Sequence, residues 1–399
     1  MMAQALDFTP SAELRRDLRT WRTRAAAIGL VALAALIAGA FFSPHQAVRS
    51  WLWSYIFYVG VAVGCMAWLM VQYLTGGAWG TVIRRPCEAA ARTLPLLAVL
   101  FLPIVFGMGG LYRWTHPEVV AADEILRHKH VYLNVPFFLI RTAVYFAGWI
   151  LLELRLNHWS AVEDREGGPL PHRRMVRLSA PGLIFWGFSI TFMAVDWVLS
   201  LDPHWFSTIF GMLFMVGQGL SSMAFLIALM VLLSYRRPMS DILTPRHLHD
   251  LGKLLLACVM VWAYFSFSQW LIIWAGNLPS EIPWYLVRLR GGWQFVALAL
   301  IFGHFALPFA LLLSRDLKRN FKLVAGVAVA VLIMRFVDLY WLVAPDFLKG
   351  SFGISWMDFA APLAIGGIWL AYFLIQLDRR PLMPANDLHL EEALEHGRE

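Results

Sequence analysis

The stretch NFKLVAGVAVAVLIMRFVDLYWL, residues 320–342, decides the fold of this chain. It is apolar over a length that crosses a bilayer, since a transmembrane helix needs about 20 such residues. Two charged side chains, Arg335 and Asp338, nevertheless lie well inside it. A charge in hydrocarbon costs at least about 3 kcal/mol on insertion scales, so such residues usually face a bundle interior or a water-filled path. The stretch therefore predicts a membrane span that presents polar groups to the inside of the protein.

Nine further segments have the same length and apolar character. The ten predicted spans cover residues 24–42, 51–74, 91–109, 132–153, 178–200, 206–234, 251–276, 291–314, 320–342 and 354–376. The chain of 399 residues is 59% hydrophobic and 15% charged, whereas soluble domains are about 25% charged. The sequence predicts an all-α integral membrane protein with about ten transmembrane helices.

The distribution of lysine and arginine predicts the orientation. Most of the 33 such residues fall on the side of the spans that also carries both termini. Because positive residues accumulate on the cytoplasmic side, we expect both termini in the cytoplasm. The chain then divides into an N-terminal segment 1–23, an uncleaved transmembrane domain 24–376 and a tail 377–399 that is a short helix or a disordered end. The same bias accounts for the net charge of +7 without a nucleic-acid partner.

Two spans end in a similar way, which suggests an internal repeat. Asp196 is followed by Pro203 at the end of one span, and Asp338 by Pro345 at the end of another. Spans four apart share a direction, so the pattern suits two parallel four-helix repeats. Only two residues match, and chance is an equally good explanation. The predicted parts are bundle one at about 51–200, bundle two at about 206–342, and flanking spans 24–42 and 354–376.

The connections between spans are too short to form a catalytic domain of their own. The longest predicted loops are 110–131 outside and 154–177 inside. Spans five and six are predicted to form a hairpin through a tight turn at Leu201–His204. Any chemistry is therefore expected within the membrane or in partner proteins.

The intramembrane charges are the first candidates for a functional site. Arg335 and Asp338 are three residues apart, which places them on one helix face within pairing distance. They are either an ion pair that locks helices together or a site that handles protons or quinol. Arg141 needs a partner in its span, and Asp196 on the next span is the expected one. Asp196 itself is either a residue near the interface or a proton-accepting group.

The remaining polar candidates lie on spans seven and eight. His304 is near the middle of span eight, and a single buried histidine is more often a hydrogen-bonded core residue than a ligand. A b-type haem in a membrane bundle would need two facing histidines, which the sequence does not provide. Span seven carries Tyr264, Ser266, Ser268 and Gln269, which either bond across helices or hold water along a proton path. No redox cofactor or metal is predicted in this chain.

Several blocks of sequence resemble the ActF-type integral membrane subunits of bacterial alternative complex III. The blocks are DWVLSLDPHWFSTIFG at 196–211, LHDLGKLL at 248–255, WAYFSFSQW at 262–270, WAGN at 274–277, GHF at 303–305 and DLYW at 338–341. The resemblance runs from about Asn134 to Phe347.

The resemblance implies a fold and a setting that composition alone does not. The fold would be like that of NrfD and the polysulfide-reductase membrane subunit, with two four-helix bundles and flanking helices in the bacterial inner membrane. The complex, respiratory or photosynthetic, oxidises quinol or menaquinol and passes electrons to cytochrome c. The expected partners are an ActC-like paralogous membrane subunit, Fe–S and multihaem cytochrome c subunits that hold the redox groups, a terminal oxidase, and bound lipids. Asp196, His304, Arg335 and Asp338, and less directly Arg141, are the polar positions that it carries over.

Three hypotheses follow. The leading one is a cofactor-free membrane subunit of a quinol-oxidising complex that contributes a proton path, a quinone site or an assembly role. A secondary transporter also predicts repeats and midplane charges, and it would be favoured by paired mid-span helix breaks. A purely structural subunit that docks partners is the third, and it predicts that the buried acids matter for assembly alone.

Overall fold

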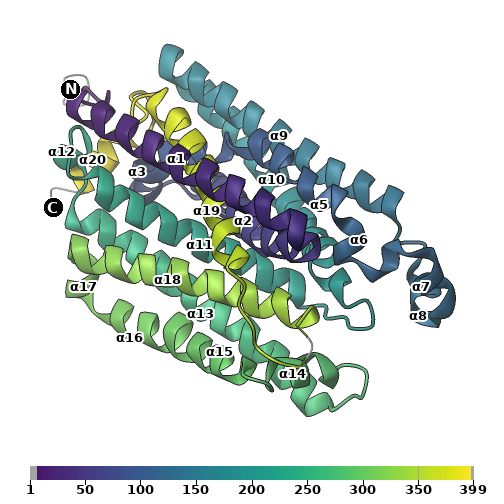
Figure 1. The fold of residues 1–399 in the computed structure, drawn as a ribbon. Helices are drawn as coiled ribbons and strands as arrows, with labels where there is room; N and C mark the ends of the chain where they lie inside the picture. The colour runs from purple at the N-terminus through teal and green to yellow at the C-terminus, as the bar shows by residue number, and fades with distance from the viewer. Residues whose placement is uncertain (1–6, 349, 397–399) are drawn as a thin grey trace.

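The computed structural model describes residues 7–348 and 350–396, and within them the chain is entirely helical and contains no strand. Ten helices of this described part are long and apolar enough to cross a membrane. They lie side by side in one elongated bundle (Figure 1). The predicted all-α membrane fold with ten spans is confirmed. Lys349 and Arg398, which entered the orientation argument, lie outside the described residues, as do 1–6 and 397–399.

The spans and their connections have the following bounds. The first half contains α1 Ala12–Phe42, α2 Pro44–Thr75, α3 Ala78–Ala91, α4 Leu94–Leu100, α5 Leu102–Phe106, α6 Met108–Leu111, η2 Arg113–Thr115, α7 Pro117–Ala122, α8 Glu124–Lys129, α9 Val135–Glu166, α10 Pro169–Trp197 and η3 Leu199–Leu201. The second half contains α11 Phe210–Leu233, α12 Met239–Ile242, α13 Pro245–Gly276, α14 Ile282–Arg288, α15 Trp293–Ala299, η4 Leu300–Ala306, α16 Leu307–Leu313, α17 Arg315–Arg319, α18 Phe321–Val343, η5 Ala344–Asp346, α19 Met357–Asp378 and α20 Leu390–His396.

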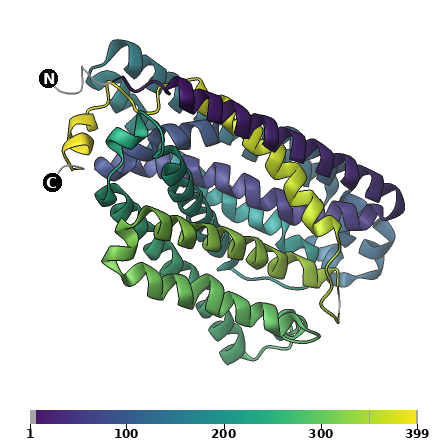
Figure 2. The same cartoon turned by 60° about the vertical axis from the view of Figure 1, so that its left-hand side comes forward.

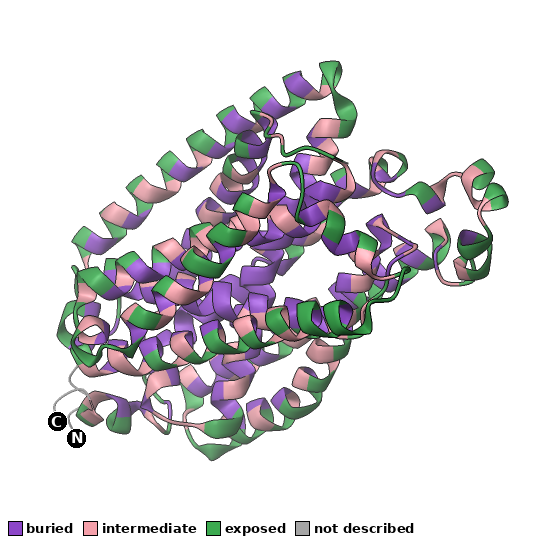
Figure 3. Cartoon of the chain, turned by 90° about the horizontal axis from the view of Figure 1, so that it is seen from below, coloured by how far each residue is buried: buried purple, intermediate pink, exposed green. Residues whose placement is uncertain are grey.

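The helices pack in two similar rings. In the first, α2 packs against α3 and α10, and α9 packs against α10 and α4; in the second, α11 packs against α13 and α18, and α16 against α13 and α18. The two rings meet where α2 packs on α11. These two helices are the most buried, at 83% and 72% of their most apolar windows. Figure 3 shows the same arrangement, with buried residues in the centre and exposed ones on the outward faces.

Helices α1 and α19 form a pair that covers α2 from outside both rings (Figure 2). The pair is close because two glycines face each other. A Cβ on Gly367 would lie 2.5 Å from the Cα of Gly29 and 2.5 Å from the carbonyl oxygen of Ala25. Small residues are common where transmembrane helices touch, because the backbones can then approach closely.

We expect Gly367→Val to destabilise the protein, because a side chain there must push α1 away from α19. Overpacking of this kind costs about 1–3 kcal/mol. The measurement is unfolding of the purified protein by SDS titration. The control is Gly326→Val on α18, where an added Cβ meets nothing within 4 Å. Equal stability of the two variants would contradict the close α1–α19 contact.

Several boundaries differ from the prediction because helices extend beyond the hydrocarbon region. The predicted loop 154–177 is wrong, since α9 ends at Glu166 and α10 begins at Pro169, which leaves Gly167 and Gly168 as the connection. The predicted N-terminal segment is helical from Ala12. The tight turn after Leu201 is a longer connection that ends only at Phe210.

The third span is the largest correction. It begins with α3 at Ala78, so Arg84 and Arg85, which the orientation argument placed in a loop, are buried inside a helix. Its outer half is divided into α4, α5 and α6, and prolines near the starts of α4 and α5 remove backbone donors there. A secondary transporter would be favoured by mid-span breaks at paired positions of the two rings. The breaks occur in span three alone of the first ring and have no equivalent in α13, which occupies the same place in the second.

Both described ends of the chain lie at the same end of the bundle (Figures 1 and 2). The backbone N–H of Leu382 donates to the carbonyl oxygen of Phe8 at 2.9 Å. The tail therefore packs against the bundle at the end where both described chain ends lie, and it includes the short helix α20. Of the two alternatives for the tail, the short helix is the one observed.

Candidate functional site

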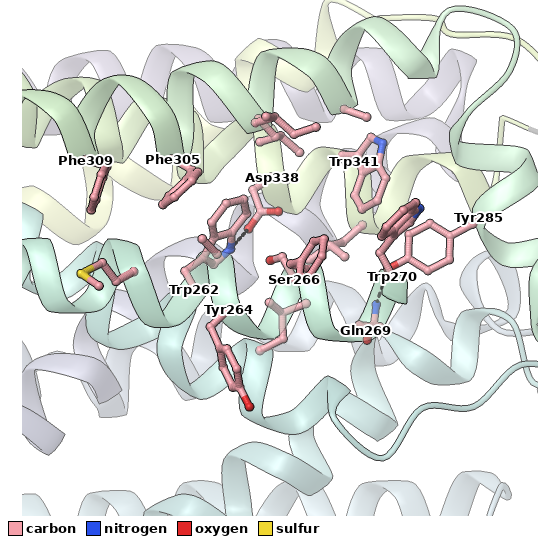
Figure 4. A pocket seen from close by; sticks show the side chains of 18 of the residues that line it. Trp262, Tyr264, Ser266, Gln269, Trp270, Tyr285, Phe305, Phe309, Asp338 and Trp341 are labelled. Atoms are coloured by element: carbon pink, nitrogen blue, oxygen red, sulfur yellow. Dashed lines mark hydrogen bonds between the residues drawn. The ribbon is translucent and has the colours of Figure 1, made fainter. Parts of the chain in front are cut away.

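The second ring contains a cavity of about 710 Å³ bounded by α13, α14, span eight and α18. Its volume is within the range of roughly 300–1,000 Å³ that small-molecule sites occupy. The wall is mostly apolar and aromatic, and it includes Trp262, Trp270, Phe305 and Trp341 (Figure 4). A few polar side chains interrupt it, namely Tyr264, Ser266, Gln269, Tyr285 and Asp338.

Helix α13 supplies one side of the cavity through its helical spacing. Trp262, Ser266 and Gln269 are four and then three residues apart, so they lie along one face. Tyr264 also lines the cavity, but Figure 4 shows its ring directed away from Asp338. Ser268 does not line the cavity, so this predicted site residue is separate from Ser266 and Gln269.

Asp338 on α18 is the charged group of the cavity wall. Its Oδ2 accepts hydrogen bonds from Arg335 of the same helix and, at 3.2 Å, from the indole Nε1 of Trp262. The predicted Arg335–Asp338 pair is confirmed, and both residues are at most 3% exposed. The guanidinium of Arg335 lies against the backbone of Gly217 on α11, where a Cβ would meet it at 2.2 Å. The cation is therefore held behind the carboxylate, on the side away from the cavity.

His304 lies next to this pair but behind the wall. Its ring is fully buried and meets the ring of Trp262 edge-on at 4.4 Å. Neither ring nitrogen has a hydrogen-bond partner among the described residues. The histidine sits in the π-helical segment Leu300–Ala306 of span eight, and π-helical turns occur frequently at functional sites. The described residues therefore supply no hydrogen bond to this histidine, and its role as a hydrogen-bonded core residue stays a prediction.

The end of the cavity near α14 has a second polar group of neutral side chains. The amide nitrogen of Gln269 donates to the hydroxyl of Tyr285 at 3.2 Å. The hydroxyl of Ser207 donates to the amide oxygen of Gln269 at 3.1 Å. Burial raises the pKa of Tyr285 to about 12, so the phenol remains protonated at physiological pH. Tyr285 was not predicted, because α14 belongs to a connection that shows no transmembrane pattern.

Arg141 and Asp196 form a separate site in the first ring, between α9 and α10. Two nitrogens of Arg141 donate to the two carboxylate oxygens at 2.9 Å each, and Tyr145 donates to Oδ2 at 2.6 Å. Arg141 also lies over the ring of Tyr132 at 3.8 Å. The predicted pairing is confirmed. Neither residue lines the cavity.

The sequence did not predict a buried cluster of charged residues at the end of the bundle where both described chain ends lie. It joins α3, α9 and the tail, and its members are Arg84, Arg85, Glu88, Ser160, Glu163, Asp164, Arg380 and Asp387. The signal was the spacing of Arg84 and Arg85 from Glu88, which suits a helix face. In the sequence these residues were counted as topological charges instead.

Within residues 7–348 and 350–396, no group of three or more His, Cys, Asp or Glu side chains is placed to hold a metal ion. A scan against protein-family models gave no match for this chain. A search of curated proteins likewise found no relative of significant similarity. The functional assignment therefore rests on the fold and on the two rings of helices with their cavity and ion pairs.

Proposed function

We propose that this chain is a membrane subunit of a quinol-oxidising complex and that the cavity beside Asp338 binds the quinol. The observation that carries the proposal is the combination of an apolar space of about 710 Å³ with one carboxylate in its wall. A quinol has the matching chemistry, with a flat aromatic head that bears two hydroxyl groups and a long isoprenoid tail. The resemblance to ActF-type subunits supports membership of a quinol-oxidising complex and a role in a proton path, and the quinol site itself is proposed from the cavity.

The side chains divide the binding work between them. Trp262, Trp270 and Trp341 provide aromatic surface for the head group. The two hydrogen bonds that Asp338 receives both fall on Oδ2, so Oδ1 is the oxygen that accepts a hydrogen bond from a quinol hydroxyl. At the other end, the hydroxyl of Tyr285 and the amide of Gln269 hold the second oxygen of a ligand.

Oxidation of one quinol releases two electrons and two protons. The electrons go to redox groups of partner subunits, which this chain does not supply. Asp338 takes the first proton, because a carboxylate hydrogen-bonded to a hydroxyl is a general base. His304 packs against Trp262, and neither of its ring nitrogens has a hydrogen-bond partner among the described residues. Buried polar groups of this kind are usually satisfied by ordered water, and such water would carry the proton away.

Two variants test the site in the intact complex purified from its native membrane. Ala297→Phe fills the cavity from span eight, and Asp338→Asn removes the base while it keeps the size of the side chain. We expect each to lower the turnover of decylubiquinol by at least about 100-fold, the usual contribution of a general base or of correct positioning. Ala297→Phe is expected to abolish binding of decylubiquinone as well, whereas Asp338→Asn retains it in part.

The controls are Ala299→Phe and Asp316→Asn. Ala299 lies two residues after Ala297 in α15 but is exposed, and Asp316 is an exposed residue of α17. Both are expected to behave as the unmodified complex. Full turnover of Ala297→Phe and Asp338→Asn in correctly assembled complexes would refute the quinol site and leave the docking role. Uptake of a solute by the isolated chain in proteoliposomes would instead favour the transporter.

A further inference from the structure

The first turns of α1 carry an unusual concentration of exposed positive charge. Arg16, Arg19 and Arg24 are exposed and Arg22 is half-buried. No hydrogen bond or ion pair joins any of their side chains to another described residue. The opposite face of the same turns is apolar and buried, through Leu14 and Leu18, which are at most 2% exposed. This basic face, Arg16, Arg19, Arg22 and Arg24, is therefore held at the surface by packing behind it.

Helix electrostatics do not explain why the charges are there. The helix macrodipole stabilises cations only near the last turn of a helix, and these arginines follow the start of α1 at Ala12 instead. The acidic residues of these turns do not compensate the basic face, because both are directed to Arg236. Asp17 lies 2.8 Å from this arginine and Glu13 lies 3.8 Å from it. Among the described residues, the positive charge of the basic face therefore has no acidic counterpart.

The same side of α1 continues as an apolar stripe. Leu30, Ile37 and Phe41 are exposed and follow Arg19 at intervals that return to nearly the same helix face. Leu30 is about 16 Å along the axis from Arg19 at the usual rise per residue. That distance is close to half the hydrocarbon thickness of about 30 Å. The other side of α1 packs on α19 and α2, so the stripe with its basic end faces away from the bundle.

We propose that the basic face and the near end of the stripe, at Leu30, together bind an anionic phospholipid of the leaflet on the side of the two termini. The phosphodiester lies among the guanidinium groups, which match its oxygens with pairs of parallel N–H donors. The acyl chains lie along α1 between the basic face and Leu30, because Ile37 and Phe41, about 27 and 33 Å from Arg19 along the axis, belong to the opposite leaflet. This site is distinct from the cavity of the second ring and does not depend on the proposed quinol chemistry.

The test uses the full-length protein in detergent, with native mass spectrometry to count bound lipids. The variant R16Q/R19Q/R22Q/R24Q removes the basic face, and the control R155Q/R165Q/R173Q/R177Q removes four exposed arginines of α9 and α10 at the same end. We expect the unmodified protein and the control to bind dioleoylphosphatidylglycerol in preference to dioleoylphosphatidylcholine. The basic-face variant is expected to bind phosphatidylglycerol at least about tenfold more weakly, because each basic residue near the membrane surface adds to the attraction for anionic lipid.

Three outcomes would overturn the proposal. An equal loss in both variants would mean that net charge alone attracts the lipid. Equal binding of phosphatidylcholine would remove the role of the anionic head group, and displacement by millimolar inorganic phosphate would identify a general anion site. R16K/R19K/R22K/R24K is a second variant that keeps the charge and the helix but lacks the paired donors. We expect intermediate affinity from it, and affinity equal to that of the glutamine variant would also contradict charge recognition.

Discussion

Replacing Arg84 by methionine is expected to lower the free energy of unfolding by about 3–5 kcal/mol, the usual result when one partner of a buried ion pair is removed. Arg84 is 1% exposed. Its guanidinium lies 3.1 Å from Glu88 and 2.6 Å from Glu163, and it also pairs with Asp387. Methionine fills a similar volume, but it leaves these three carboxylates with less positive charge in a region that water does not reach.

The measurement is the SDS mole fraction at which the purified protein unfolds. Arg165→Met, at an exposed position of α9, removes the same charge and is expected to unfold as the unmodified protein does. Arg84→Met stability equal to that of this control would mean that water reaches the carboxylates and that the cluster is not a buried one.

Arg141→Leu is expected to have an effect of similar size, about 3–5 kcal/mol, at the other charged site. Asp196 is fully buried and depends on Arg141 for two hydrogen bonds. With the arginine gone, Tyr145 is its remaining side-chain donor. The same SDS titration measures the loss.

The double variant Arg141→Leu/Asp196→Leu distinguishes a stranded charge from lost packing. Replacing both members of a buried pair by apolar residues is often neutral. We therefore expect the double variant to regain most of the stability that Arg141→Leu loses. If the double variant is as unstable as the single one, the arginine stabilises the start of α9 through its contacts with Tyr132 and Phe137 instead.

The ten spans could be predicted because hydropathy over about 20 residues is a local property. The start of the third span could not. Arg84 and Arg85 resemble a loop in any local window. They are accommodated in α3 because Glu163 and Asp387 reach Arg84, and Asp164 reaches Arg85, from distant parts of the chain. Neutralisation by residues far apart in sequence is invisible to a hydropathy average.

The candidate site shows the same limit at the level of side chains. The Arg335–Asp338 pair follows from spacing on one helix, and Arg141–Asp196 from charges on successive spans that must be paired. Ser268 was grouped with Gln269 because they are adjacent, although only one of them faces the cavity. Tyr285 became part of the site through the placement of α14, which depends on tertiary packing.

The tail that closes the charge cluster also sets an order on biogenesis. Asp387 is 303 residues beyond Arg84 in the chain. A ribosome that has made the first nine spans has not yet supplied that carboxylate, nor Arg380 for Glu88. The termini end of the bundle therefore reaches its final form only after Asp387 has been translated, when all ten spans have already been made.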